Sequence, residues 1–481
     1  MLADKRMPFV RQCLVAAAVS INMAGFGCST GFLAIMLPQL QKPGSTISVS
    51  KEQASWLVSV GTMTLVFGTF LVPSIMSRLG RKVALYVITV VSILAWCTYI
   101  LATSYEVLLL GAMAHGFSFG MFAPLRSIYI GECSSPHYRG GLLTTCVESQ
   151  IFGVLFVHLI GSLISFQSTA ISCLPFPVTS LLLTIYSPES PSWLATKGDF
   201  DRCEKNFIWL RGEDEIAELK KMIQTANLPR DPKTVKEMIA VIKKKEFFKP
   251  ILLMFTLYII VTCAGGLVMA VYAVTVFELL MGPEVNARIW MVSLDCLRAL
   301  STIIAVFVIN KVKRRKMLFS VGSICVGSQL CIGAYVFARN RGYLPLNSWM
   351  PGILKSVQMM SVSMGMQPLP GVIAGEIYPL EHRSISGSIG LTMLSLSAFA
   401  VLKSYPSLIS GIGLEGAYFL FSGIITVCLM VAWMVLPETS GRTLQEVEDH
   451  FRVLEPEAES ERQPLLHSVN SVTTSYLSTR K

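Results

Sequence analysis

Residues 129–140 read YIGECSSPHYRG, and residues 375–384 read GEIYPLEHRS. Each stretch closes a long apolar run, and in each a glutamate precedes an arginine by seven positions. The first pair is Glu132 and Arg139, and the second is Glu376 and Arg383. The copies lie about 240 residues apart, which is half of the chain. The stretch therefore predicts a molecule built from two similar halves.

Two further motifs repeat at the same offset. SRLGRK at 77–82 recurs as NKVKRR at 310–315, and SPESPSWL at 187–194 recurs as LPETSGRTL at 436–444. Three matches in the same order indicate a parallel duplication. Parallel halves are typical of transporters whose two halves rock about a central site.

The composition places the chain in a membrane. Of its 481 residues 52% are hydrophobic and 15% charged, and the mean hydropathy is +0.58. A soluble protein carries roughly a quarter charged residues. Apolar runs such as 83–102 and 416–436 are long enough to cross a hydrocarbon core of ~30 Å as helices. They are continuous and do not alternate, which disfavours a β-barrel. We predict an all-α membrane protein.

Twelve transmembrane helices are expected in two six-helix halves. Their predicted limits are 12–36, 54–76, 83–103, 107–130, 141–165, 168–186, 250–277, 287–309, 317–338, 349–374, 386–409 and 414–436. The expected domains are an N-terminal half at 1–186, a cytoplasmic linker of short amphipathic helices at 187–249, a C-terminal half at 250–454 and a disordered tail at 455–481.

The net charge of +10 does not point to nucleic acid. Most Lys and Arg residues lie in short loops that fall on one side if the spans alternate, so that side and both termini are predicted to be cytoplasmic. The twelve cysteines show no metal-binding spacing and are interpreted as small buried hydrophobic residues. We find no phosphate loop, metal cluster or hydrolase motif, so neither an enzyme nor a cofactor is expected.

Taken together, the motifs resemble the sugar porter family of the major facilitator superfamily, closest to the facilitated trehalose transporter-like branch of arthropods. The resemblance covers nearly the whole chain. The resemblance rests on the motifs SRLGRK, YIGECSSPHYRG, PESPSWL, GEIYPLEHRS, FAVLKSYPSL (399–408) and PETSGRTLQEVE (437–448). It implies the major facilitator fold and alternating access.

The resemblance also implies a cytoplasmic gate, in which charged residues tie the two halves together in the outward-facing state. The matching residues are Glu132, Arg139, Arg81, Glu376, Arg383, Arg314, Arg315, Glu189 and Glu438. An alternative interpretation is that these basic loops only fix orientation in the membrane. The chain departs from the family pattern at Ser77, Ala112, Ser192 and Lys313. The gate of the first half therefore has fewer charged residues than the family pattern.

Most of the family's sugar ligands are missing. Gly265 is kept on span seven, but the glutamine and asparagine positions around it hold Val261, Thr262 and Leu267. A tryptophan position on span ten falls on Gly371. The Asn-Trp pair of span eleven falls on Leu394 and Ser395, and a glutamine of span five falls on Val147.

Four polar residues remain as candidate ligands: Gln150, Glu148, Asp295 and Arg298. Asp295 and Arg298 are three residues apart and can pair along a helix. They could form a structural pair, or Arg298 could bind an anionic solute through bidentate contacts. His115 and His158 are expected to be packed and neutral, with a proton relay as the alternative interpretation. Ser29 stands where proton-coupled relatives carry aspartate, which favours uncoupled transport.

We therefore expect facilitated transport of a small-molecule solute across the lipid bilayer, with a sugar such as trehalose or a hexose as the first candidate. A non-sugar, perhaps anionic, solute and a non-transporting sensor are the alternatives. In the tail, ERQPLL resembles an acidic dileucine signal, which would recruit a sorting adaptor at Glu461, Leu465 and Leu466. The expected location is the plasma membrane, with possible endosomal or lysosomal cycling.

Overall fold

The computed structural model describes residues 2–42, 44–45, 47–226, 245–282, 285–309, 311–345, 349–378 and 383–440. Side chains are described from residue 7 onward, except those of 225–226, 245–247 and 383–385. Within these ranges the chain forms helices and no strand. The predicted all-α fold is confirmed.

The first half holds five long helices and a split sixth. These are α1 (Leu2–Leu40), α2 (Lys51–Leu79), α3 (Arg81–Ile100), α4 (Tyr105–Cys133), α5 (Pro136–Gly161), α6 (Phe166–Cys173) and α7 (Pro175–Tyr186). Together α6 and α7 make the predicted sixth span, which is interrupted before Pro175 because proline cannot donate a helical hydrogen bond. The six spans predicted for this half are confirmed within a few residues at most ends.

The second half contains two discontinuous spans. Its elements are α12 (Lys245–Cys263), α13 (Gly266–Met281), α14 (Ala287–Ile309), α15 (Arg314–Asn340), α16 (Met350–Ser361), the π-helical turn η2 (Val362–Met366), α17 (Leu369–Ile377) and α18 (Arg383–Val435). Helices α12 and α13 form span seven. Helices α16 and α17, with η2 between them, form span ten.

Ten helices in the described ranges are long and apolar enough to cross a membrane. One of them, at 386–435, contains both predicted spans eleven and twelve, bent at Gly413, whose φ is +76°. Span ten is not among the ten, because its break leaves helical pieces that are too short. With these two differences explained, the segments agree with the twelve that the sequence predicts.

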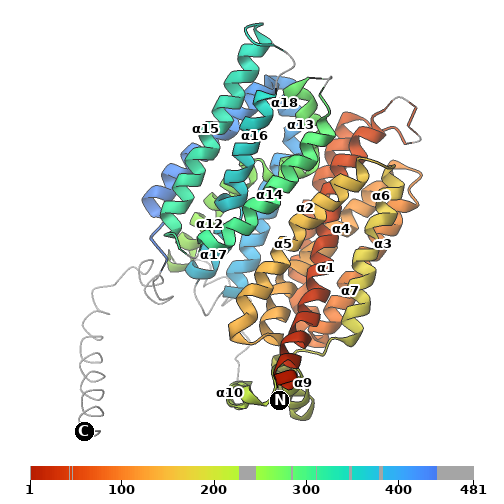
Figure 1. Cartoon of the computed structure of the whole chain (residues 1–481), viewed down its shortest axis with the longest axis vertical. Helices are drawn as coiled ribbons and strands as arrows, with labels where there is room; N and C mark the ends of the chain where they lie inside the picture. Colours follow the sequence, from red (N-terminus) through yellow and green to blue (C-terminus); the bar gives the residue numbers. More distant parts are fainter. Residues whose placement is uncertain are drawn as a thin grey trace, which may run out of the picture.

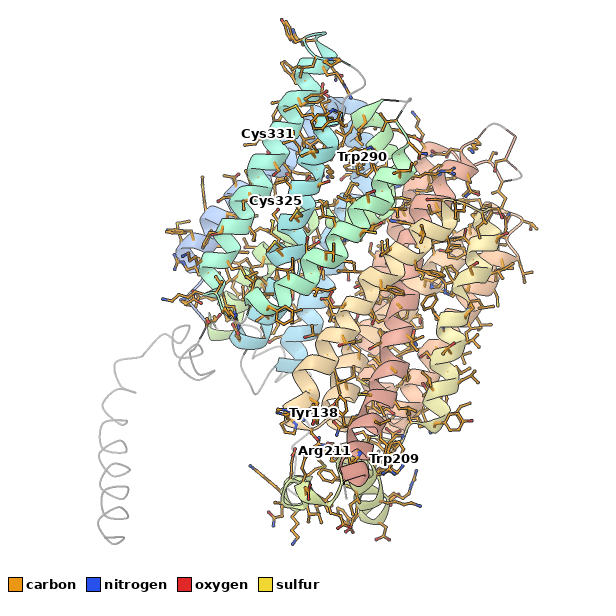
Figure 2. The ribbon with its side chains drawn as sticks, in the orientation of Figure 1. Tyr138, Trp209, Arg211, Trp290, Cys325 and Cys331 are labelled. Atoms are coloured by element: carbon orange, nitrogen blue, oxygen red, sulfur yellow. The ribbon has the colours of Figure 1, made fainter. Side chains whose placement is uncertain are left out.

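Short helices follow the first half: α8 (Pro191–Thr196), α9 (Phe200–Arg211), η1 (Glu213–Glu215) and α10 (Ile216–Ala226). They share a small core that includes Cys203, Phe207 and Leu219, and they lie beside the start of α1 (Figure 1). Arg11 donates from Nη1 to the Trp209 carbonyl at 3.0 Å. Figure 2 shows Trp209 and Arg211 at this end of the molecule. The remainder of the predicted linker, 227–244, lies outside the described residues.

The helices of the first half pack at backbone contact. A Cβ atom on Gly116 of α4 would lie 2.0 Å from the Gly61 carbonyl of α2, and one on Gly153 of α5 would lie 2.0 Å from the Ala24 carbonyl of α1. Such distances leave no room for a side chain. Small residues at these positions let two membrane helices approach closely enough for extensive van der Waals contact.

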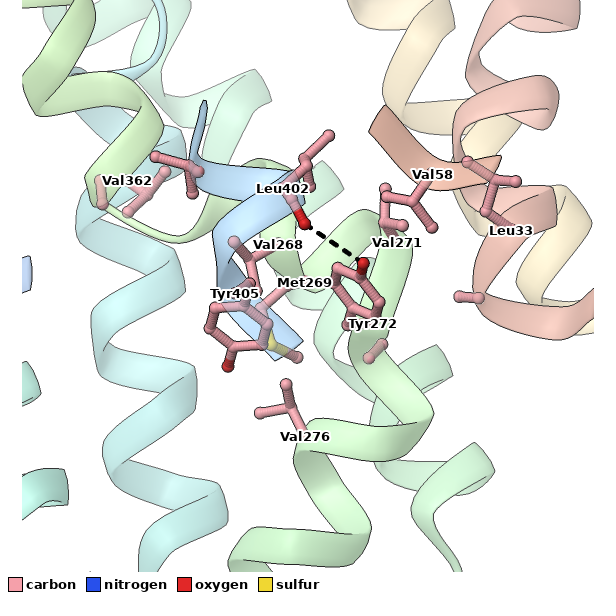
Figure 3. Packing of buried hydrophobic residues seen from close by; sticks show 14 of the residues in the cluster. Leu33, Val58, Val268, Met269, Val271, Tyr272, Val276, Val362, Leu402 and Tyr405 are labelled. Carbon is pink, nitrogen blue, oxygen red and sulfur yellow. Dashed lines mark hydrogen bonds between the residues drawn. The ribbon is translucent and has the colours of Figure 1, made fainter. Parts of the chain in front are cut away.

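The two halves meet at the end of the bundle away from the N-terminus. The early part of α1, from Val15 to Phe26, belongs to a core made only of first-half residues and Leu210 of α9. From Cys28 onward α1 enters a larger core that also holds much of α12, α13 and α18. Figure 3 shows Leu33 and Val58 of the first half facing Val271 of the second.

Polar and aromatic contacts reinforce this junction. Ser55 of α2 donates to the Lys403 carbonyl of α18 at 3.2 Å. The Lys403 ammonium lies 4.1 Å from the centroid of the Trp56 ring, a cation–π geometry, and Trp56 also contacts Phe399. At the same end Arg288 of α14 donates to the Ser162 carbonyl beyond α5 at 2.8 Å. The halves are therefore sealed against each other at this end.

Candidate functional site

Span seven is interrupted at the centre of the molecule. Gly265 separates α12 from α13 and has φ +89°, a left-handed conformation that glycine adopts at little cost. Two amide side chains satisfy carbonyls that the break leaves free. Gln358 donates to the Ala264 carbonyl at 2.9 Å, and Gln329 donates to the Cys263 carbonyl at 3.2 Å. Inside a membrane such interruptions are tolerated where protein groups replace the lost hydrogen bonds.

Span ten is interrupted next to this point. Its π-helical turn η2 follows Ser361, and a Cβ on Gly266 would lie 3.2 Å from a methyl carbon of Val362 and 3.6 Å from Oε1 of Gln367. The breaks of spans seven and ten are thus in contact. Single-turn π-helical segments occur frequently at functional sites, so this junction is the first candidate for a binding site.

Three ionisable side chains meet between α5 and α14. Asp295 accepts from His158 Nδ1 at 2.5 Å on one carboxylate oxygen and from Arg298 Nη1 at 3.4 Å on the other. All three are buried, with His158 0% and Arg298 4% exposed. Asp295 and Arg298 make the contact that their spacing allows, and a ligand role for Arg298 stays a prediction. His158 was expected to be a packed neutral histidine, and the structure adds a polar role, because its imidazole contacts a carboxylate of the other half.

A lysine that is not among the predicted ligands lies at the same depth. Lys355 of α16 is 3% exposed, and its Nζ donates to Gln358 Oε1 at 2.8 Å. Its ammonium lies 5.1 Å from the centroid of the Tyr418 ring. A Cβ on Gly265 would be 3.7 Å from this Nζ, so the lysine borders the break in span seven. The signal was available, because a lysine inside a predicted span is by default a functional candidate.

Two predicted ligands lie farther along α5. Glu148 and Gln150 precede His158 by ten and eight residues, which places them about 15 and 12 Å nearer the start of the helix at 1.5 Å per residue. In the described part of the chain no hydrogen bond or ion pair joins them to Asp295, Arg298 or Lys355.

Gly371 also lies apart from the charged residues. It is exposed on α17, and a Cβ there would meet nothing within 4 Å. The open space leaves room for a solute, but the structure does not bring Gly371 into contact with Asp295 or Arg298. A role for Glu148, Gln150 or Gly371 in binding stays a prediction.

The predicted gate residues of the first half form one cluster. Arg81 donates from Nε and Nη2 to the two oxygens of Glu132, both at 2.8 Å. Ser190 donates to Glu132 Oε2 at 2.5 Å. Glu189 accepts from the backbone N–H groups of Arg81 and Lys82 at 2.9 and 3.2 Å. Glu189 therefore caps the N-terminus of α3, where unpaired N–H groups and the helix dipole favour an anion.

The second half repeats this cluster with the same residue pairs, although its arginine contacts only one carboxylate oxygen. Arg314 donates from Nε and Nη2 to Glu376 Oε1, both at 3.3 Å. Glu438 accepts from the backbone N–H groups of Arg314 and Arg315 at 3.0 and 3.2 Å, capping α15. Thr439 donates to Glu376 Oε2 at 2.6 Å, in the place of Ser190. The internal repeat read from the sequence is thus visible as a repeated hydrogen-bond network.

The remaining predicted gate residues differ. Arg139 donates to the Ser134 carbonyl at 3.4 Å and lines a hollow of about 360 Å³ together with Glu132 and Arg211. Arg315 closes the end of α18, donating to the carbonyls of Leu436 at 3.1 Å and Trp433 at 2.6 Å. The side chain of Arg383 lies outside the described residues. In the described part of the chain every contact of these charged clusters stays within its own half.

Comparison with known proteins gives a consistent result. The profile of the family described as Sugar (and other) transporter matches residues 13–451. The facilitated trehalose transporter Tret1 of Culex quinquefasciatus is 26% identical over 443 residues, covering 91% of this chain and 85% of the relative. The Bombyx mori protein of the same name is 25% identical over 440 residues, covering 91% and 86%.

Solved structures share the fold. The proton:xylose symporter XylE bound to 6-bromo-6-deoxy-D-glucose aligns with a TM-score of 0.72 at 17% identity, covering 93% of this chain and 99% of that one. The inward open conformation of XylE from E. coli aligns with a TM-score of 0.71 at 16% identity, covering 92% and 99%. The arrangement of helices is therefore that of the major facilitator superfamily.

Proposed function

The chain belongs to the Sugar (and other) transporter family, and from that premise we propose that it carries a sugar across a membrane by facilitated diffusion and alternating access. The observation that supports this most directly is a polar cluster between two halves that touch at one end. Asp295 of the second half contacts His158 of the first and pairs with Arg298 of its own helix, beside the broken spans seven and ten. A solute held there could be released to either side as the halves rock.

The described state is closed at one end. The large shared core and the Ser55–Lys403 contact join the halves away from the N-terminus. At the other end the charged clusters pair internally. With both termini on the cytoplasmic side, as the distribution of Lys and Arg predicts, this is a state sealed toward the outside.

The charged clusters act as a gate in this proposal. When the carrier turns outward, the ends of α4 and α17 with Glu132 and Glu376 approach each other, and arginines such as Arg139 and Arg383 gain partners across the halves. Each half-exposed pair contributes little. A small contribution is sufficient, because it only has to bias two nearly equal states.

The cargo proposed first is trehalose or a hexose. Two relatives at about a quarter identity are named for trehalose, and the candidate ligands are Gly265, Gly371, Glu148, Gln150, Asp295 and Arg298. The transport is proposed to be independent of a proton gradient, because Ser29 offers no titratable group where proton-coupled relatives carry aspartate.

The protein is proposed to act in the plasma membrane, which it crosses several times. Cycling through endosomes or lysosomes would require an adaptor that recognises Glu461, Leu465 and Leu466, which lie outside the described residues. Replacing both leucines by alanine in a tagged full-length chain would test the signal. A surface pool that does not change would reject it.

Uptake into proteoliposomes tests the transport proposal. Labelled trehalose and glucose are offered at two pH gradients, with protein-free vesicles as the control. Saturable uptake that reaches equal concentrations on both sides, at the same rate in both gradients, is the expected result. Accumulation that follows the pH gradient would contradict uncoupled transport. Binding of sugar in detergent without any flux would favour a sensor over a carrier.

A further inference from the structure

The buried charges near the breaks of spans seven and ten do not balance. Of the charged side chains that the structure describes within the spans, three are less than a tenth exposed: Asp295, Arg298 and Lys355. Two are cations and one is an anion. An uncompensated charge inside a membrane protein is costly, so this imbalance calls for an explanation.

Asp295 neutralises only part of this charge. Its carboxylate is shared between His158 at 2.5 Å and Arg298 at 3.4 Å. The longer contact uses a single nitrogen of Arg298, and the Nε of that residue is buried without a hydrogen-bond partner in the described part of the chain. Buried N–H groups are nearly always paired, so the guanidinium retains a donor for a further acceptor.

Lys355 has no carboxylate partner among the described residues. Its Nζ has the neutral Gln358 amide at 2.8 Å and the face of the Tyr418 ring. The hydroxyl of Tyr418 is also buried without a partner there. Arg298 on α14 and Lys355 on α16 belong to two helices that pack against each other. Two buried cations on adjacent helices, each with unused hydrogen-bonding capacity nearby, are typical of a site for an anion.

The backbone at the start of α13 also favours a bound anion. Helix α13 begins at Gly266 with no side-chain cap, and Lys355 lies beside the preceding Gly265. The N-terminal end of a half-helix carries a partial positive charge. In transporters with discontinuous spans such ends face anionic groups of the substrate.

We propose that Arg298 and Lys355 form a carboxylate-binding site and that the solute is a sugar acid, a hydroxylated monoanion such as a uronate, in preference to a neutral sugar. The inference rests on the proposed transport function and names the substrate class of that same site. The carboxylate would neutralise the excess cation and accept charge-assisted hydrogen bonds from both side chains.

The test compares glucuronate with glucose, which differ at one terminal carbon that is a carboxylate in the first and a hydroxymethyl group in the second. Full-length protein in proteoliposomes is expected to transport glucuronate with a kcat/KM about 10- to 100-fold higher, the range for hydrogen bonds to charged groups. An inside-positive potential of about 60 mV should accumulate glucuronate about tenfold and leave glucose at equal concentrations.

Variants assign the effect to the site. Lys355→Met should abolish most of the preference for glucuronate, and Lys355→Arg should keep it. Lys403→Met is the matched control, because it also removes a span lysine that lies over an aromatic ring, but at the junction of the halves. It should leave the ratio of the two solutes unchanged.

Each outcome decides a separate point. Equal uptake of glucose and glucuronate, unaffected by Lys355→Met, would overturn the inference and leave the transport proposal standing. A preference that survives Lys355→Met would overturn the assignment to this lysine. If neither solute is transported, and trehalose is not transported either, the transport proposal fails. Melting of the protein in detergent then decides whether the anion binds. Glucuronate and glucose are each added in 10-fold steps, and the shifts in melting temperature are compared.

Discussion

His158 Nδ1 and Asp295 Oδ2 lie 2.5 Å apart and connect the fifth span of the first half to the eighth span of the second. The contact is buried on both sides, with side-chain exposures of 0% and 4%. It can exist only while the halves are closed at this level. It therefore contributes to the balance between the two states of the carrier and not only to the stability of one half.

Removing the histidine should shift that balance. A hydrogen bond to a charged group contributes about 1.5–3 kcal/mol. His158→Ala should therefore raise, by about tenfold or more, the population in which the halves are open at the end of the bundle away from the N-terminus. Ser55, buried at the junction, reports this population. A Ser55→Cys chain should react with a membrane-impermeant maleimide several times faster when His158→Ala is added. A cysteine at Thr69, buried within the first half, is the control and should stay unreactive in both backgrounds.

Neutralising Asp295 should be more damaging than removing an exposed acid at the same spacing. Asp295→Asn leaves Arg298 buried without an opposite charge, at a cost of about 3 kcal/mol. Asp199 pairs with Arg202, also three residues away, but the side chains are 37% and 67% exposed. Melting of the purified protein in detergent should show a large loss for Asp295→Asn and no measurable loss for Asp199→Asn. Equal losses would contradict a buried ionic role.

The two capping glutamates should protect matching amides. Glu189→Ala removes the acceptor of the first N–H groups of α3 and should cost about 1 kcal/mol. Hydrogen exchange should accelerate at Arg81 and Lys82 in that variant and at Arg314 and Arg315 in Glu438→Ala. Unchanged exchange at both pairs would show that these carboxylates do not hold the helix ends.

The pH dependence of Glu189 has a definite sign. Burial raises the pKa of the Glu189 carboxyl above its usual value, although backbone N–H groups oppose the shift. The folded state then binds this proton more tightly than the unfolded chain. The resulting stability is present below the usual pKa and is lost as pH rises through the raised pKa.

A comparison with Glu189→Gln isolates this effect. The melting temperature of the wild type relative to the variant should rise on acidification across that interval. A fall would mean that the hydrogen bonds from Arg81, Lys82 and Ser190 outweigh burial.

Gly80 should resist substitution more than another glycine of positive φ. Gly80 has φ +101°, and a Cβ there would lie 2.3 Å from Glu189 Oε2; Gly198 has φ +78° with nothing within 4 Å. Gly198→Ala adds only backbone strain, about 1 kcal/mol. Gly80→Ala adds a collision with the carboxylate that caps α3, and the φ +101° and ψ 169° of Gly80 lie in a region essentially restricted to glycine, so its loss of stability should be clearly larger. Similar losses for both would contradict this expectation.

Much of the fold could be predicted from the sequence because its signals are local. An apolar run long enough to cross the bilayer predicts a span regardless of its neighbours, and the three repeated motifs predict the halves. The breaks at Gly265 and at Val362 were not predicted. The break at Gly265 depends on Gln358 and Gln329, which come from other spans and supply hydrogen bonds that no single segment reveals.

The site was predictable only in part for the same reason. The spacing of Asp295 and Arg298 on one helix indicates their pair directly. The contact with His158 joins residues 137 positions apart, and no periodicity predicts it. Lys355 needed no structure to be noticed, since its position within span ten was enough. The repeated clusters around Glu132 and Glu376 were predicted as gate residues, but their capping of α3 and α15 through Glu189 and Glu438 emerged only from the backbone geometry.

The interruptions at Gly265 and at the π-helical turn after Ser361 have a mechanical consequence. Both lie in the second half, where they interrupt the helical ladder, and at Gly265 the freed carbonyls are satisfied by the side-chain amides of Gln358 and Gln329. The first half is packed backbone against backbone at Gly116 and Gly153. Flexibility is thus unequally distributed between the halves. The first half is stiff, and the second half can bend around a solute bound between them.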